Sequence, residues 1–230
     1  MPIAIVIPTL NEEHALPATL QHIAEIMPNA HVIVADGGST DRSKAAAHSV
    51  PKLNLTWLDA PRGRGNQMNA GAAAANEEVL LFLHADTLLP AHTSELVETA
   101  LQDASVPGGY FRIAFHPVTP LTAFYAALYN LRSLGGVCYG DAAIFVRRDL
   151  FQQIGGYQLG LIMEDLDLVK RMQRLGRLHY IRNGSVTTSS RQFRTTRSAL
   201  KMAATWLILP LLLQLGWSQE RLAALYPSSR

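Results

Sequence analysis

The sequence predicts an α/β fold in which a mixed, mostly parallel central sheet is flanked by helices. Three observations support this prediction. Short apolar runs at residues 3–7, 31–35 and 79–83 are typical of buried strands, and residues 53–58 are expected to form a further strand. Helical segments separate these runs, and strands that alternate with helices form right-handed crossovers and a parallel sheet. The 230 residues suffice for one sizeable core and are too few for two full domains.

In the first half, turn residues and then a helix follow each of the first three strands. The Asn-Glu-Glu run at 11–13 is expected to open the first helix, because acidic residues in a first turn suit the helix dipole. A tight glycine turn at 36–41 leads to a second helix, expected from Arg42 onwards. A basic glycine loop at 62–66 precedes the third helix, over the alanine-rich residues 67–76.

The second half of the sequence is less regular. Residues 108–115 alternate like a half-exposed strand, which we expect at the antiparallel edge of the sheet. A further strand is expected to begin at 139–141 and to end at Val146, and residues 183–193, rich in small polar side chains, are expected to form a mobile loop. Helices are expected over residues 91–104, 121–134, 147–154 and 163–175.

Charge is unevenly distributed in the chain, although the net charge of +2 gives no global indication of nucleic-acid binding. Residues 168–219 contain nine Lys or Arg and no Asp or Glu. Such a segment suits a polyanionic ligand or an anionic surface, and a solvated helix face is the alternative. The apolar run 206–213 is shorter than the roughly 20 residues that span a bilayer, so we expect a core, dimer-interface or membrane-surface helix.

The single cysteine, Cys138, excludes an internal disulfide, fits a reducing compartment and is interpreted as a packing residue. The chain starts directly with a strand and has no basic segment before it, so a signal peptide is not expected. These features favour a cytoplasmic protein, with the cytoplasmic membrane face as the alternative location.

Polar residues follow each of the four strands, so in a parallel sheet they converge on one edge. Glycines there let backbone N–H groups approach phosphate, and arginines add charge-assisted hydrogen bonds to a diphosphate. Asp86 offers the oxygen ligand that Mg²⁺ or Mn²⁺ prefers, although it could simply cap the next helix. The converging residues are Pro8, Thr9 and Glu12, then Asp36 and Gly37, then Arg62, Arg64 and Gly65, and finally His84, Ala85 and Asp86.

Two common nucleotide-binding classes are disfavoured. The sequence has no Gly-x-x-x-x-Gly-Lys-Ser/Thr loop, which argues against a P-loop ATPase, and no Gly-x-Gly-x-x-Gly follows the first strand, which argues against a dinucleotide dehydrogenase.

At these residues the chain resembles the family 2 inverting glycosyltransferases, which have a nucleotide-sugar-binding fold of the GT-A type. The resemblance covers roughly residues 3–180 and is closest to the small bacterial branch of arsenosugar-associated or radical-enzyme-associated transferases. Its motifs are Ile7–Glu12 (IPTLNE), Ala35–Asp41 (ADGGSTD), Arg62–Gln67 (RGRGNQ), His84–Asp86 (HAD) and the pair Glu164-Asp165.

The resemblance implies a single transferase domain in three parts. Residues 1–105 would bind the nucleotide sugar, residues 106–194 would serve the acceptor and catalysis, and residues 195–230 would form a C-terminal apolar helix extension. Asp165 would be the general base, with Glu164 beside it orienting sugar or acceptor. A plain acidic first turn is the alternative for this pair.

The resemblance also implies roles at the donor site. Pro8, Thr9 and Glu12 would contact the nucleoside, Asp36 would read the base, and Arg64 would lie near the base and diphosphate. Asp86 would hold Mg²⁺ or Mn²⁺. The family commonly has Asp-x-Asp where this chain has His84-Ala85-Asp86, so His84 could bind metal, contact ribose or bond to backbone.

Two residues of the second half join the donor-site prediction. Asp141 could hold donor-sugar hydroxyls, or merely form a strand-entry turn. Arg191 could clamp the diphosphate from a mobile lid, or lie on an exposed loop. The segment Arg191–Arg194 is not the Gln-x-x-Arg-Trp signature of processive synthases, so transfer of a single sugar is expected.

The expected donor is a UDP-sugar, and the acceptor, a small metabolite or a lipid, stays open. Alternatives are a nucleotidyltransferase and a nucleotide-sugar-binding or membrane-scaffold module without turnover. The C-terminal apolar helix would provide either peripheral membrane contact or a homodimer interface. No nucleic-acid partner is expected.

Overall fold

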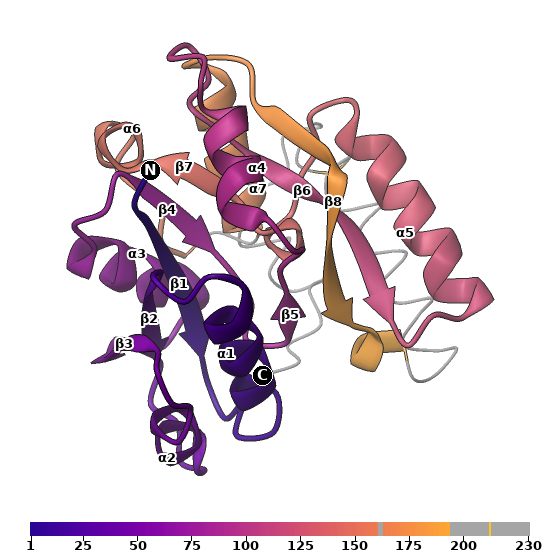
Figure 1. Cartoon of the computed structure of the whole chain (residues 1–230). Helices are drawn as coiled ribbons and strands as arrows, with labels where there is room; N and C mark the ends of the chain where they lie inside the picture. Colours follow the sequence, from indigo (N-terminus) through magenta and orange to yellow (C-terminus); the bar gives the residue numbers. More distant parts are fainter. Residues whose placement is uncertain (161–162, 194–211, 213–230) are drawn as a thin grey trace.

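An eight-stranded mixed sheet is the framework of the residues that the structure describes (Figure 1). The structure is a computed structural model, and it describes residues 1–160, 163–193 and 212. The strand order is β3-β2-β1-β4-β7-β6-β8-β5. The strands are β1 (Ile3–Thr9), β2 (His31–Asp36), β3 (Asn54–Asp59), β4 (Val79–Phe82), β5 (Thr87–Leu88), β6 (Gly108–His116), β7 (Phe145–Arg147) and β8 (His179–Ser189).

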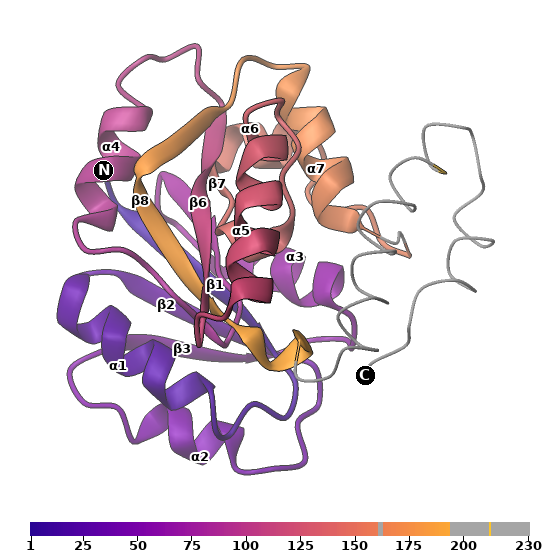
Figure 2. The same cartoon turned by 90° about the vertical axis from the view of Figure 1, so that its right-hand side faces the viewer.

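Helices cover both faces of the sheet. In Figure 2, α1 and α4 lie on one side and α3 and α7 on the other, while α5 packs along β6. The helices are α1 (Leu16–Ile26), α2 (Ser43–His48), α3 (Arg64–Ala74), α4 (Thr93–Ala100), α5 (Pro120–Ser133), α6 (Arg148–Gln153) and α7 (Glu164–Gln173), with two 3₁₀ turns, η1 (Gly140–Ala142) and η2 (Ser190–Phe193). Among the described residues, none of these helices is both long and apolar enough to cross a bilayer.

The parallel half of the sheet confirms the prediction from the apolar runs. β1 pairs in parallel with β2 and with β4, and β2 pairs in parallel with β3. Every residue of β4 is buried, and Cys138 is buried as a free thiol, as expected of a packing residue. Gly71 lets α3 approach β1 closely, because a Cβ at this position would overlap Val6 Cγ1. The carboxyl ends of β1, β2 and β4 therefore meet at one edge.

The prediction of an edge strand at 108–115 is wrong. β6 lies inside the sheet, antiparallel to β7 and parallel to β8. Its alternating pattern arises because only one face of this strand is covered along much of its length. β8 pairs with β6 from Gly109 to His116, while β7 pairs only with Gly108 and Gly109.

The expected loop at 183–193 is also corrected. Residues 183–189 belong to β8, which pairs with β6 as far as the register His116↔Ser189, and only the following residues form η2. Their small polar side chains alternate with the buried Val186 and Thr188, so this segment is a strand and not a mobile lid.

Several predicted boundaries move. The first helix begins at Leu16 and not at residue 11, with Pro17 in its first turn, where the missing N–H of proline costs nothing. The third begins at Arg64, because Gly63 supplies the positive φ of 124° at its N-cap. The helix expected at 91–104 is shorter, and the strand expected from 139 starts only at Phe145, after η1. The C-terminal helix extension expected at 195–230 lies outside the described residues, apart from Leu212.

Candidate active site

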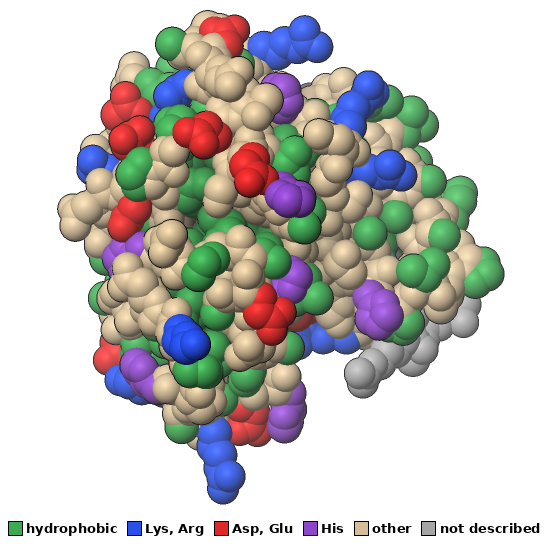
Figure 3. Space-filling view, viewed as in Figure 1, with side chains coloured by type: hydrophobic (Ala, Val, Ile, Leu, Met, Phe, Trp, Pro, Cys, Tyr) green, Lys and Arg blue, Asp and Glu red, His purple; other side chains and the backbone are tan. Residues whose placement is uncertain are grey.

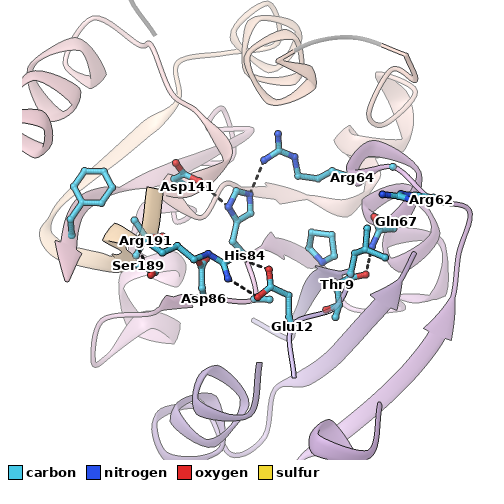
Figure 4. Close-up of a pocket in the computed structure, with 16 residues that line it drawn as sticks. Thr9, Glu12, Arg62, Arg64, Gln67, His84, Asp86, Asp141, Ser189 and Arg191 are labelled. Atoms are coloured by element: carbon cyan, nitrogen blue, oxygen red, sulfur yellow. Dashed lines mark hydrogen bonds and ion pairs between the residues drawn. The ribbon is translucent and has the colours of Figure 1, made fainter. Parts of the chain in front are cut away.

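A cavity of about 160 Å³ opens at the edge where the parallel strands end (Figure 4). Residues after β1, β3 and β4 line one side, and η1, β8 and η2 line the other. Ten of the residues predicted from the sequence line this cavity: Pro8, Thr9, Glu12, Arg62, Arg64, His84, Ala85, Asp86, Asp141 and Arg191. Five do not: Asp36, Gly37, Gly65, Glu164 and Asp165. Loops that are distant in sequence therefore converge as the topology predicts.

The loop after β1 is tied to the loop after β2 by reciprocal hydrogen bonds from backbone amides. Residues 11–13 do not start a helix, because Asn11 has a positive φ of 55°, outside the range of a right-handed helix. The bonds run from the amides of Asn11, Glu12 and Glu13 to Ser39 Oγ, Ser43 Oγ and Asp41 Oδ2, and from the amides of Thr40 and Arg42 to Asn11 Oδ1 and Glu13 Oε2, all at 2.8 to 3.0 Å.

Asp36 lies beside the cavity and not on its wall. Its Oδ2 accepts the amides of Gly38 at 3.1 Å and Ser39 at 2.9 Å, and its Oδ1 accepts the Ser39 hydroxyl. The neighbouring Gly37 amide donates to the Thr9 carbonyl at 2.9 Å. In this structure the carboxylate shapes its own turn. The base-reading role predicted for Asp36 stays a prediction.

Arg191 joins the two acidic residues on the lower side of the cavity, as Figure 4 shows. Its Nη1 and Nη2 donate to Glu12 Oε2 at 2.9 Å and Oε1 at 2.6 Å, and its Nε lies 3.0 Å from Asp86 Oδ2. Burial raises the pKa of Asp86, and the positive charge of Arg191 beside it opposes that rise. The Arg191 guanidinium is thus shared by two carboxylates of the cavity.

His84 connects the opposite side of the cavity. Its Nδ1 lies 2.8 Å from Asp141 Oδ1, and its Nε2 lies 3.4 Å from Arg64 Nη1, while Arg64 Nε donates to Glu164 Oε1 at 2.7 Å. Because a guanidinium can only donate, this arrangement assigns the ring proton to Nδ1, facing Asp141. Both ring nitrogens therefore have partners, and His84 would have to release one of them to bind a metal.

Asp165 begins α7 and is 7% exposed. Its Oδ2 accepts the Gly140 amide at 2.5 Å and its Oδ1 accepts the Leu166 amide at 2.8 Å. Burial raises the pKa of Asp165, the positive Arg64 opposes this shift, and Glu164 adds to it. A Cβ built on Gly140 would lie 3.0 Å from His84 Nε2 and 3.1 Å from Asp165 Oδ2. The absence of a side chain at Gly140 thus leaves open the space that lies next to both Asp165 and the cavity residue His84.

The expectation that Asp36, Arg64, Asp86 and Asp165 surround one cavity is met in part. Arg64 and Asp86 line it, while Asp36 and Asp165 do not. The carboxylate of Asp36 accepts a hydrogen bond from the Ser39 amide of its own turn, and the carboxylate of Asp165 accepts one from the Gly140 amide.

Two residues on the cavity wall carry features that the sequence reasoning did not single out. Gln67 is buried, and its Nε2 donates to the carbonyls of Thr9 at 2.7 Å and Ala35 at 2.8 Å, which fastens the ends of β1 and β2 together. The available signal was an amide side chain near the start of an alanine-rich helix. Thr9 Oγ1 is buried without a hydrogen-bond partner among the described residues. A buried hydroxyl on a cavity wall suits a polar ligand.

The arrangement suits an anion together with a divalent cation. Arg62, Arg64 and the amino end of α3 provide positive charge and backbone donors for phosphate oxygens. Asp86 provides one hard oxygen ligand on the same wall. Among the described residues there is no cluster of three or more metal-ligating side chains, so other ligands of a cation would come from the bound anion or water.

Sequence comparison places the chain among known proteins. Residues 4–155 match the family described as glycosyl transferase family 2. The chain is 32% identical over 165 residues to a PGL/p-HBAD biosynthesis glycosyltransferase from Mycobacterium tuberculosis, covering 68% of this chain and 63% of that protein. The chain therefore spans less than two thirds of this relative's length.

Solved structures share the fold at low sequence identity. A mannosyltransferase from Pyrobaculum calidifontis, in complex with GDP-Man and Mn²⁺, superimposes with a TM-score of 0.70 at 22% identity, covering 94% of this chain and 64% of that chain. S. aureus TarS 1–349, in complex with UDP-GlcNAc, gives a TM-score of 0.67 at 16% identity, covering 91% of this chain and 67% of that chain.

Proposed function

The chain belongs to glycosyl transferase family 2 and has a GT-A-like fold, and from this premise we propose that it transfers a single sugar from a nucleotide-diphospho-sugar to an acceptor, with inversion. The observation that carries this proposal is the cavity at the edge of the parallel strands, which Arg62, Arg64 and Asp86 line on one side and Arg191 on the other. Positive side chains and a carboxylate at such an edge suit a diphosphate bound with a cation.

We assign the donor site to the parallel half of the sheet. Arg62, Arg64 and the amino end of α3 would bind the diphosphate, and the unpartnered hydroxyl of Thr9 would gain a polar contact there. A UDP-sugar is the proposed donor. The TarS structure, which is in complex with UDP-GlcNAc, supports this choice, while the Pyrobaculum structure is in complex with GDP-Man, so both nucleotides belong in the test.

We propose that Asp86 holds Mg²⁺ or Mn²⁺ together with the diphosphate oxygens. Its carboxylate lines the cavity, and the structural neighbour from Pyrobaculum is in complex with Mn²⁺. When bound, the cation would stabilise the negative charge that develops on the leaving nucleoside diphosphate. Asp86 and Arg191 would position the donor so that this charge faces the positive side of the cavity. The metal-ligand role of His84 stays a prediction.

Asp165 is the proposed general base, with Glu164 holding Arg64 in place through their 2.7 Å contact. Inverting transfer needs a group that removes the proton of the attacking hydroxyl, and a positioned base contributes typically about 10²–10⁴-fold. The raised pKa of Asp165, caused by burial, makes its ionised form a stronger base than an exposed aspartate. Asp165 does not line the cavity, and its carboxylate accepts the amide of Gly140 in η1, which lies next to the cavity residue His84.

The direct test is donor turnover by the purified chain. UDP-glucose, UDP-GlcNAc and GDP-mannose, each with and without Mn²⁺, are screened by thermal shift, because a ligand that binds only the native state raises its stability. Release of nucleoside diphosphate is then measured for Asp165→Asn and for Asp167→Asn. Asp167 is a matched control, since it lies in the same helical turn and pairs with Arg171 at 2.7 Å.

We expect Asp165→Asn to lose turnover while donor binding survives, and Asp167→Asn to keep both. Asp86→Asn is expected to lose the part of the donor-induced shift that depends on Mn²⁺. Binding without turnover for every donor and acceptor would favour a nucleotide-sugar-binding or membrane-scaffold module. Turnover of a nucleoside triphosphate in place of a nucleotide sugar would favour a nucleotidyltransferase.

The narrower resemblance, to the arsenosugar-associated or radical-enzyme-associated branch, stays a proposal, as do the three-part division of the chain and a cytoplasmic location. The acceptor is a small metabolite or a lipid under this proposal. The homodimer or membrane contact predicted for residues 195–230 concerns residues outside the described part of the chain.

A further inference from the structure

The outward face of α5 is apolar along its whole length. Phe124 and Leu131 are 63% and 65% exposed, and Leu121 and Leu134 are also exposed, as is Val118 just before the helix at 72%. We call these five side chains the α5 surface. The helix itself is packed on the protein, because its opposite face buries Thr122, Tyr125, Tyr129 and Ser133. The five side chains are therefore exposed on a well-packed helix.

Such a helix departs from the pattern of a helix that faces water on one side. A surface helix normally carries charged or polar side chains on its outward face. In α5 the only charged residue is Arg132, near its carboxyl end. A contiguous exposed apolar patch usually marks a binding surface, so the α5 surface needs a partner.

Charge around the α5 surface is positive. Residues 104–140 contain no Asp or Glu. Arg112 on β6 and Arg182 on β8 are exposed on the two strands beside α5, and Tyr180, which contacts Asn130 of α5 at 3.2 Å, has the Arg182 guanidinium 5.9 Å from its ring centre. In Figure 3 apolar side chains gather over α5, with Lys or Arg side chains next to them. The surface is therefore apolar with a basic margin.

We propose that the α5 surface docks on a lipid bilayer that contains anionic phospholipids. A helix that lies in the bilayer interface buries an apolar face among the headgroups and places basic residues against anionic lipid. A second copy of this chain fits less well. Two α5 surfaces paired about a two-fold axis would bring the basic margins together, and this part of the chain has no acidic side chain to neutralise them.

The location of the α5 surface relates it to the cavity. Phe115 on β6 lines the cavity, and Val118 of the α5 surface follows it by three residues. Ser189, which also lines the cavity, pairs with His116 on β6. Docking at α5 therefore brings this rim of the cavity near the bilayer. Docking at this place favours an acceptor carried by a lipid. This consequence, unlike the docking itself, rests on the proposed function.

The test is flotation of the full-length chain with vesicles of phosphatidylcholine alone and of phosphatidylcholine with phosphatidylglycerol. The variant Phe124→Gln/Leu131→Gln changes the α5 surface, and Leu159→Gln is the matched control, since Leu159 is 60% exposed on a different element. Both variants change exposed side chains, so their melting temperatures are expected to stay close to that of the parent chain.

We expect the parent chain and Leu159→Gln to float with the anionic vesicles, and the double variant to lose partitioning about tenfold or more. Equal flotation of the double variant would overturn the proposal, because it would assign binding to another segment. Equal flotation with phosphatidylcholine alone would overturn the anionic part. If light scattering showed a dimer for the parent chain and a monomer for the double variant, and the parent did not bind vesicles, the α5 surface would instead be a contact with a second copy. None of these readouts uses sugar transfer, so failure here and failure of the proposed function remain distinguishable.

Discussion

Arg191 and Glu12 form a two-point ion pair that joins residues 179 positions apart, with distances of 2.6 and 2.9 Å. The same guanidinium lies 3.0 Å from Asp86. The positively charged Arg191 side chain thus lies between two carboxylates of the cavity, at the place where we propose that a divalent cation binds. Metal binding at Asp86 and the Arg191 contact are therefore expected to compete.

Arg191→Ala is expected to raise the affinity of the nucleotide-free chain for Mn²⁺, because the positive neighbour of Asp86 is removed. A partly exposed ion pair is worth up to about 1 kcal/mol, which corresponds to about fivefold in affinity. Titration followed by the electron paramagnetic resonance of free Mn²⁺ measures this directly. Arg191→Lys keeps the charge and is the control. Weaker Mn²⁺ binding in Arg191→Ala would mean that Arg191 positions Asp86 for the metal.

Asp165→Asn is expected to change how stability depends on pH. The raised pKa of Asp165 in the folded state means that the native protein binds this proton more tightly than the unfolded chain. The parent therefore loses stability as pH rises from the ordinary aspartate value through the raised pKa, whereas the variant does not. The difference in melting temperature between variant and parent should move in favour of the variant from pH 4 to pH 7. A difference that is constant over this range would contradict the raised pKa.

Gln67→Glu is expected to destabilise the fold by about 2 kcal/mol or more, because it sets a buried carboxylate against the carbonyls of Thr9 and Ala35. Gln67→Met removes the two donors without adding charge and should cost less. Urea unfolding at pH 7 compares the two. At pH 4 the introduced carboxyl group can be protonated and can donate one hydrogen bond, so the difference in unfolding free energy between Gln67→Glu and Gln67→Met should become smaller. The same difference at pH 4 and pH 7 would contradict this reasoning.

Gly71→Ala is expected to destabilise the chain by about 1–3 kcal/mol, although alanine favours helices, because its Cβ would overlap Val6 Cγ1. The second-site change Val6→Ala removes the overlapping methyl groups. The loss of unfolding free energy in the double variant should be about 1 kcal/mol smaller than the sum of the losses in the two single variants, because contacting sites are coupled. Strict additivity in chemical unfolding would show that α3 shifts to relieve the overlap.

The central strands of the parallel half could be predicted because β1, β2 and β4 are largely continuous apolar runs, and such runs indicate burial without knowledge of their neighbours. The position of β6 could not. Its sequence alternates as at an edge, yet β8, some 70 positions later in the register Gly109↔His179, pairs with it and closes that edge. Pairing over such a separation leaves no local pattern in the sequence.

The candidate site divides in the same way. Arg64, His84 and Asp86 follow strands whose order could be predicted, and the structure places them on one cavity wall. The contact of Arg191 with Glu12 could not be foreseen, because it depends on β8 running the full length of β6. A motif predicts Asp165, but no motif indicates the hydrogen bond that its carboxylate accepts from the Gly140 amide of η1.

The hydrogen bonds that tie the loop after β1 to the loop after β2 make the two loops a single cooperative unit. Neither loop can unfold locally without exposing the amides of both, since each supplies side-chain acceptors for the other. Amide hydrogen exchange at Glu12, Glu13, Thr40 and Arg42 should accordingly be slow and correlated. Motions that open the cavity are then expected in η1 and η2. A ligand would enter from the side of these two segments, while the loops after β1 and β2 keep their conformation.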